Sequence, residues 1–205
     1  MKKINVLNFL PIVLACSFFF ACNQNPTSFY LQTVKQELAK KSTRNDSLFL
    51  GMNLGMRADT FFNLCRRLNN DGIIRDGIDV TAMTVSYQLN KKEFKSPAAM
   101  NFFPKFKDTT MLEMGISFTY DGWAPWNEEM KASKLLPEVK TLLEKWYGGG
   151  FFSIGKKQGE KVWVKIDGNR RILLFVADDH RVRTLIADLS RLDDPTRPLE
   201  PADLK

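Results

Sequence analysis

Histidine and cysteine are scarce in this 205-residue chain, which contains one histidine and three cysteines. Two of the cysteines, Cys16 and Cys22, lie in an apolar N-terminal segment, so Cys65 is the only thiol expected in the folded part. With a single thiol left, no intramolecular disulfide can form, and stability must come from the hydrophobic core. The single histidine, His180, also offers little material for a zinc site or for histidine-based catalysis.

A strong excess of one charge is also absent. Lys plus Arg exceeds Asp plus Glu by 30 − 23 = 7, and the basic residues are spread along the chain without an arginine-rich arm. We therefore expect no nucleic-acid partner, and at most a mild attraction to anionic lipid headgroups. Hydrophobic residues make up 44% of the chain, which is enough to bury the core of one compact domain or of two small ones.

One long apolar run is present, at the N-terminus. Lys2 and Lys3 precede the uncharged segment 4–21, INVLNFLPIVLACSFFFA, and the polar segment NQNPTS follows Cys22. This pattern predicts a removable signal peptide rather than a membrane span, because a small residue and a cysteine end the run and no basic cluster follows. Cleavage before Cys16 would leave apolar SFFFA at the mature N-terminus, so Cys22 is the preferred position and Cys16 the alternative.

This N-terminal segment resembles bacterial lipoprotein signal peptides, in which a cysteine after a small residue receives a diacylglycerol, with acyl chains such as palmitate, and becomes the mature N-terminus. The resemblance implies a signal peptide at 1–21 and lipid attachment at Cys22. Asn23, at the second mature position, is not the Asp that retains enteric lipoproteins in the inner membrane, which implies the outer membrane. No acidic run follows Cys22, so an orientation facing the periplasm is expected.

Helical periodicity appears in three places. Residues 22–45 are predicted to be a tether with a possible short helix, because three apolar residues recur there at four-residue spacing. A clearer amphipathic helix spans 57–69 and ends at Asn70-Asp71-Gly72. Another has Pro137 in its first turn and stops at Gly148-Gly149-Gly150.

Three strands are predicted after each of the two clearer helices. In the first set, two strands alternate apolar and polar residues, and Pro104 places the shorter one between them at an edge or ends it. In the second set, Asp167-Gly168-Asn169 forms a hairpin turn. The predicted strands are 83–89, 99–107 and 112–120 in the first set, and 161–166, 170–177 and 181–189 in the second.

The shared order of helix, glycine stop and three strands predicts an internal repeat. A shift of 78 residues places Leu68 opposite Trp146 and Gly72 opposite Gly150, although two amphipathic helices could match by coincidence. The expected fold class is α+β, with tandem α-βββ repeats whose helices pack on one face of an antiparallel sheet. The predicted divisions are 46–122 for the first repeat, 123–190 for the second and 191–205 for an extended C-terminal tail.

A tandem α-βββ chain with a lipoprotein leader is similar to the architecture shared by the outer-membrane assembly lipoprotein BamE and the β-lactamase inhibitory protein. The segment GMRADTFF, residues 55–62, resembles the start of the BamE-type first helix, but the Gly-x-Pro that commonly follows that helix is missing. The stretches LGMNLGM, FFNLCRRLN, DGWAPWN, EKWYGGGFF and KVWVKIDGNRRI also resemble an uncharacterised lipoprotein group of Gram-negative bacteria. The first resemblance implies a binding or scaffolding protein without catalysis.

Candidates for chemistry are few. A Cys65–His180 pair could supply a nucleophile and its base, but Cys65 falls on the apolar face of its helix, where a buried hydrophobe is the usual role. Asp178, Asp179 and His180 are adjacent in one turn, and adjacent residues rarely converge on one ion, so no metal site is expected. The three glycines follow a helix, whereas phosphate-binding glycines precede one, so they are expected to end the helix rather than bind an anion.

Trp123 and Trp126 form the most suggestive candidate site, in the segment between the predicted repeats. They could fill the seam between the repeats, anchor in the pocket of a partner protein, or stack on a sugar ring. The sequence thus predicts a non-enzymatic envelope lipoprotein that binds or scaffolds another envelope protein, without a cofactor. The alternative is a carbohydrate- or peptidoglycan-binding module that uses Trp123 and Trp126.

Overall fold

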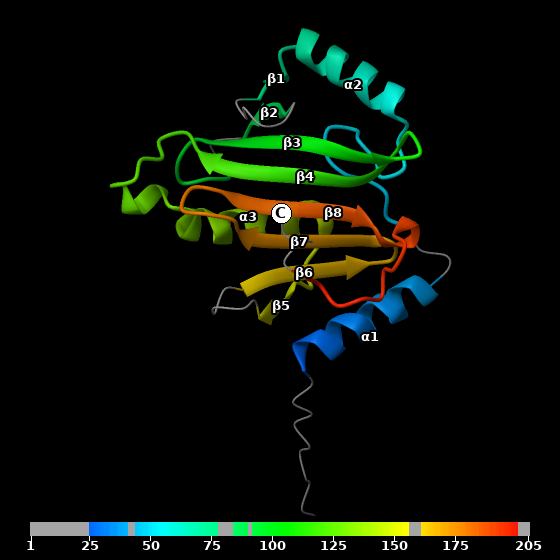
Figure 1. Ribbon diagram of the computed structural model, residues 1–205. Helices are drawn as coiled ribbons and strands as arrows, with labels where there is room; N and C mark the ends of the chain where they lie inside the picture. The colour runs from blue at the N-terminus through cyan, green and yellow to red at the C-terminus, as the bar shows by residue number, and fades with distance from the viewer. Residues whose placement is uncertain (1–24, 41–43, 78–83, 90–91, 156–160, 201–205) are drawn as a thin grey trace, which may run out of the picture.

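The computed structural model describes residues 25–40, 44–77, 84–89, 92–155 and 161–200 (Figure 1). Cys16, Cys22 and the predicted signal peptide lie outside these residues. The described helices are α1 (Pro26–Ala39), α2 (Ala58–Asn70) and α3 (Ala132–Tyr147), with two 3-10 turns at Glu128–Met130 and Leu189–Arg191. The strands are β1 (Ile74–Asp76), β2 (Val85–Gln88), β3 (Ala98–Lys107), β4 (Thr110–Tyr120), β5 (Phe152–Gly155), β6 (Lys161–Asp167), β7 (Arg170–Val176) and β8 (Val182–Asp188).

The eight strands form one open antiparallel sheet in the order β1-β2-β3-β4-β8-β7-β6-β5. The predicted α+β class is therefore confirmed. Each half of the sheet is a meander that follows one helix, and the two meanders join through β4 and β8, where Ser117 pairs with Arg183. Four described strands follow each of α2 and α3, not the predicted three. The additional strands, β1 and β5, have only three and four residues, too few for an alternating pattern to reveal them.

The main core lies between α3 and one face of the sheet. Leu135, Val139 and Leu143 of α3 are fully buried, and they belong to the same apolar cluster as Ile116 and Phe118 of β4. These β4 residues are two apart, so they point to one face of the strand. The loop before α2 and the inner side of α2 extend this cluster toward β1.

The helix α1, which precedes the predicted repeats, packs on the opposite face of the sheet from α2 and α3. Tyr30 and Val34 of α1 are buried in a second cluster with Leu173 and Phe175 of β7, whereas Ile172 and Leu174 of the same strand belong to the α3 cluster. Figure 1 shows α1 beside β5 and β6, with α3 behind the sheet. Residues 26–39 are thus part of the folded body, although the sequence analysis predicts a tether over 22–45.

Two proline positions differ from the prediction. Pro104 lies in β3, which is an interior strand of ten residues, but β2 pairs with β3 only as far as Phe102. Among the described residues, the part of β3 that contains Pro104 pairs with β4 alone, where Pro104 lies opposite Met114. In α3, Pro137 lies inside the helix, which begins at Ala132 rather than at the proline. The backbone N–H of Ala132 donates to the Asp179 carbonyl at 2.8 Å, which fixes the earlier start.

Glycines end both predicted helices, as the sequence indicates. Gly72, Gly148 and Gly150 have φ values of +70°, +80° and +93°. These left-handed conformations favour glycine because a Cβ atom would crowd the backbone. An added Cβ at Gly150 would meet no atom within 4 Å, so close helix–sheet packing is not the reason for a glycine there.

We expect Gly150→Val to lower the free energy of unfolding by about 1–2 kcal/mol, because valine is strained at this backbone angle. Gly149→Val is the matched control, since Gly149 has the same open surroundings but no positive φ. Chemical denaturation of both variants measures the difference. Equal losses in the two variants would contradict the backbone explanation.

Candidate binding site

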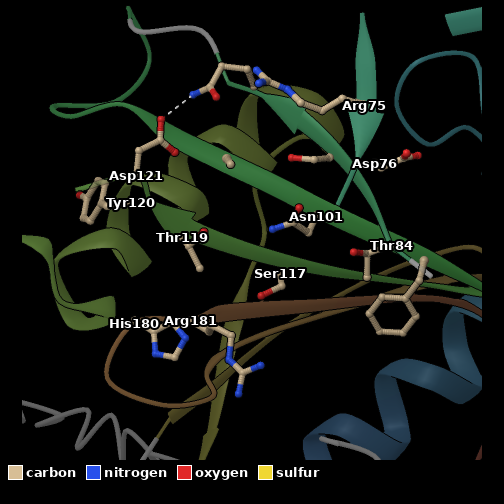
Figure 2. Close-up of a pocket in the computed structure, with 14 residues that line it drawn as sticks. Arg75, Asp76, Thr84, Asn101, Ser117, Thr119, Tyr120, Asp121, His180 and Arg181 are labelled. Atoms are coloured by element: carbon tan, nitrogen blue, oxygen red, sulfur yellow. Dashed lines mark hydrogen bonds between the residues drawn. The ribbon is translucent and has the colours of Figure 1, made fainter. Parts of the chain in front are cut away.

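A polar trough occupies the part of the sheet that α1 leaves uncovered. It lies over β1 to β4 on the face opposite α3, and its volume is about 640 Å³. In Figure 2, Asn101, Ser117 and Thr119 stand on the same side of β3 and β4. Side chains from β1 lie at one end of the trough, and the β7–β8 turn, with His180 and Arg181, lies at the other.

The register of the strands aligns five polar residues in one row across the sheet. Arg75 pairs with Ser86, Ser86 with Asn101, Asn101 with Ser117, and Ser117 with Arg183. Paired residues point to the same face, and four interstrand steps of about 4.8 Å make the row roughly 19 Å long. Three neutral hydrogen-bonding side chains thus lie between two guanidinium groups.

A small apolar platform lies beside this row. The Phe103 ring covers Gly115 on the neighbouring strand, where an added Cβ would come within 2.5 Å of the ring. The Arg183 guanidinium lies 5.5 Å from the centre of the Phe103 ring. Gly115 therefore lets the ring lie flat against β4, and the arginine stacks on it.

Hydrogen bonds define the upper rim of the trough. The Gln88 side-chain amide donates to the carboxylate of Asp121 at 3.1 Å and to the Ala98 carbonyl at 3.0 Å. The Ser117 hydroxyl, on the trough floor, is inaccessible to solvent and has no hydrogen-bond partner among the described residues.

The Asp178 carboxylate organises the β7–β8 turn at the end of the trough. It accepts hydrogen bonds from the backbone N–H groups of His180 (3.1 Å) and Arg181 (2.9 Å), and from the Arg181 guanidinium at 2.7 Å. Partial burial would raise the pKa of Asp178, but these hydrogen bonds outweigh it and hold the pKa below its usual range. Across the described ranges, no group of His, Cys, Asp and Glu side chains could hold a metal ion.

We expect Asp178→Asn to lower the free energy of unfolding by about 1 kcal/mol at pH 7, because a charged hydrogen-bond acceptor is lost. The lowered pKa means that the carboxylate stabilises the fold above about pH 4, and that this stabilisation is lost as the pH falls through the folded-state value. Denaturation curves from neutral to acidic pH should therefore show a shallower acid loss in the variant. A variant with an unchanged pH profile would exclude this contribution.

The two tryptophans of the candidate site have different surroundings. The Trp123 indole is half-buried and lies 4.7 Å from the His180 ring, centre to centre. Trp126 is 84% exposed, and neither tryptophan lines the trough. Neither is a core residue of the seam between the two halves, so that interpretation is not supported. Trp126 remains available as an anchor for a partner.

Cys65 and His180 have separate environments. Cys65 packs at the edge of the main core on α2, and burial raises the pKa of its thiol to about 11. His180 contacts Trp123 and lies with Nδ1 3.0 Å from the Asp178 carboxylate. A thiol with a raised pKa is a poor nucleophile, which favours the packing role expected for Cys65.

The triple glycine, residues 148–150, contacts Lys165 of β6 through a backbone carbonyl oxygen. The carbonyl of Gly149 accepts a hydrogen bond from Lys165 Nζ at 2.8 Å. An anion nest would instead direct successive N–H groups at a ligand. The glycines lie outside the trough, and their contacts agree with the role of a helix end.

The chain matches no known family model, and no curated protein is significantly similar to it in sequence. Among solved structures, it is similar to a DUF4309 family protein (YjgB) from Bacillus subtilis subsp. subtilis strain 168. The two are 14% identical, the match covers 80% of this chain and 98% of that chain, and the TM-score is 0.33. A TM-score this low does not establish a common fold, so no property of that protein is carried over. No described helix is both long and apolar enough to cross a membrane.

Proposed function

We propose that this protein is a non-enzymatic lipoprotein of the bacterial envelope, anchored through Cys22 to the outer membrane on its periplasmic side, that binds another envelope protein in the trough. The trough is the single observation that supports this proposal most. It is a concave surface of about 640 Å³ on the sheet, left open because α1 covers only the other half of that face.

The chemistry of the trough favours binding over catalysis. Its central row consists of neutral side chains, Ser86, Asn101 and Ser117, spaced across three strands. Hydrogen-bonding groups spread in this way suit an extended surface, whereas catalysis uses titratable groups that converge on one reacting atom. Arg75 and Arg183 at the two ends of the row add charged donors, and arginine is common in protein interfaces.

The two halves of the sheet are proposed to be copies of one ancestral repeat. Each half is a helix followed by a four-strand meander, and the halves meet antiparallel at β4 and β8. In this proposal, α1 is an addition outside the repeat. It covers the second half and so makes the first half the binding half.

Photo-crosslinking in intact cells tests the binding proposal. A photoreactive residue at Asn101 should yield one discrete crosslinked protein, which mass spectrometry can identify. The control position is Arg66 on the exposed side of α2, where no such product is expected. Failure of Asn101 to crosslink any protein, with normal yields of folded lipoprotein, would remove the proposal.

The anchor has its own test. Cys22→Ala should abolish lipid attachment and leave the leader uncleaved, as judged by mass spectrometry of the intact protein. Cys16→Ala is the matched control and should change neither. A normally processed, acylated Cys22→Ala protein would place the lipid elsewhere and favour Cys16.

A glycan is the second candidate ligand, because neutral hydroxyl and amide side chains in the trough also suit sugar hydroxyl groups. In this form, exposed Trp126 and half-buried Trp123, which contacts His180 at the end of the trough, would supply the stacking surface. Pull-down with peptidoglycan and other polysaccharides, repeated with both tryptophans changed to alanine, tests the idea. Glycan binding that survives both changes would exclude the tryptophans from the site.

A further inference from the structure

The position of α1 determines how far the folded body can lie from its membrane anchor. Asn25 caps the helix, since its side chain accepts a hydrogen bond from the Thr27 backbone N–H at 3.0 Å, and Pro26 is the first helical residue. Pro26 lies four positions after Cys22 along the sequence. A chain of four residues spans at most about 14 Å, so the start of α1 must lie within that distance of an acylated Cys22.

Both ends of α1 are fastened to the sheet. Tyr30 is 1% exposed, and its hydroxyl accepts a hydrogen bond from Arg171 Nη1 at 3.1 Å. Near the other end, the Glu37 carboxylate accepts a hydrogen bond from the Gly168 backbone N–H at 3.0 Å. The helix therefore cannot serve as additional tether without losing these buried contacts.

An exposed aromatic residue lies at the end of α1 that is closest to the anchor. Phe29 is 41% exposed, and its ring packs edge-on against Phe152 of β5, with 4.9 Å between the ring centres. The β5 strand is an edge of the sheet and has only four residues. Aromatic side chains at a membrane surface gain apolar burial.

We propose that the N-terminal turn of α1 and the β5 edge form the membrane-contacting face of the protein, with Phe29 at the lipid interface. This proposal rests on acylation of Cys22 in the proposed function. Its occupant is the phospholipid bilayer itself. The short linker brings this face to the bilayer, and Phe29 with Phe152 supplies the apolar contact.

The proposal also sets the distance between the trough and the membrane. Four interstrand steps separate β5 from β4, and seven separate β5 from β1, so the trough extends from roughly 19 Å to roughly 34 Å from the β5 edge. The width of the sheet, rather than a flexible tether, then sets the reach of the binding site into the periplasm. The trough would then meet its partner at that distance from the bilayer.

Spin labels at two exposed positions test the orientation. Ser28→Cys lies beside Phe29 at the start of α1, and Asn69→Cys lies at the end of α2, near the opposite edge of the sheet. Both are made in the full chain with Cys65→Ala, and the mature protein is reconstituted into vesicles of phosphatidylcholine and phosphatidylglycerol. The label at position 28 should collide several-fold less with a water-soluble nickel chelate, and more with oxygen, than the label at position 69.

A linker variant provides the control. A long Gly-Ser segment inserted between Gln24 and Asn25 should release the body and make the two labels more alike. Mass spectrometry of the same samples shows whether the acyl chains are present. An acylated protein whose label at position 28 is as accessible to the nickel chelate as that at position 69 would overturn the membrane face alone. A protein without acyl chains would overturn the anchor, and the membrane face with it.

Discussion

Arg170→Ala should lower the free energy of unfolding by about 3 kcal/mol, since a buried guanidinium is lost with its hydrogen bonds and Asp167 keeps only the more distant Lys165, at 3.6 Å, as an ion-pair partner. Arg170 is only 6% exposed. Its guanidinium donates to both carboxylate oxygens of Asp167, at 3.1 and 2.8 Å, and to the Ser47 carbonyl at 2.7 Å. It also stacks on the Tyr147 ring, 4.6 Å from the ring centre.

These contacts connect three parts of the molecule: the β6–β7 hairpin, the segment before α2 and the end of α3. Chemical denaturation measures the loss, and Arg170→Lys should lie between the wild type and the alanine variant, because lysine keeps the charge but not the two-pronged geometry. Arg57→Ala is the control, since Arg57 pairs with Asp59 on the exposed surface and should change little. Equal effects at the two arginines would contradict the account of Arg170.

Tyr30→Ala should lower the free energy of unfolding of α1 by about 4 kcal/mol, because a buried aromatic ring is lost. The loss also removes the acceptor of the buried Arg171 guanidinium. Tyr30→Phe isolates that hydrogen bond and should cost about 1 kcal/mol.

Amide hydrogen exchange shows which elements lose stability in the Tyr30→Ala variant. In Tyr30→Ala, the amides of α1 should lose protection while those of β7 and β8 keep most of theirs, because the main core lies on the other face. Val34→Ala is a second variant with a smaller expected loss. Unchanged protection of α1 in Tyr30→Ala would contradict its docking on the sheet, and would remove the basis of the membrane-contacting face.

Much of the fold could be predicted because the signals are local. Helical spacing indicates α2 and most of α3, alternation indicates β4 and β6, and the turn at residues 167–169 indicates the hairpin that leads into β7. The extra strands β1 and β5 could not be found in this way, since they are short and are formed by pairing with neighbours at the sheet edges. The early start of α3 depends on the hydrogen bond between Ala132 and Asp179, which are far apart in sequence.

The face occupied by α1 did leave a signal in the sequence. Residues 172–176, ILLFV, form a continuous apolar run, which is typical of a strand covered on both faces. In contrast, Ser117 and Thr119 alternate with apolar residues in β4, as expected for a strand with one open face. The contrast predicts a cover over β7 and an open surface over β4, and the tether interpretation of residues 22–45 missed it.

The candidate site was less predictable than the fold. The residue type points to Trp123 and Trp126 as a site, but both lie outside the trough. The row from Arg75 to Arg183 comes from five strands and depends on their register, which no local pattern determines. The sequence indicates only that Ser86 and Ser117 occupy the polar face of their own strands.

The central claim is that the trough binds the partner, and the binding of a filled-trough variant tests it most directly. Ser117→Trp places a large side chain in the middle of the polar row, and Trp126→Ala removes the exposed aromatic outside it. Affinity measured for the crosslinked partner should fall at least tenfold in Ser117→Trp, about 1.4 kcal/mol, with unchanged unfolding behaviour. Undiminished affinity in Ser117→Trp, with a loss in Trp126→Ala, would contradict the claim and move the binding site to the turn at Trp126.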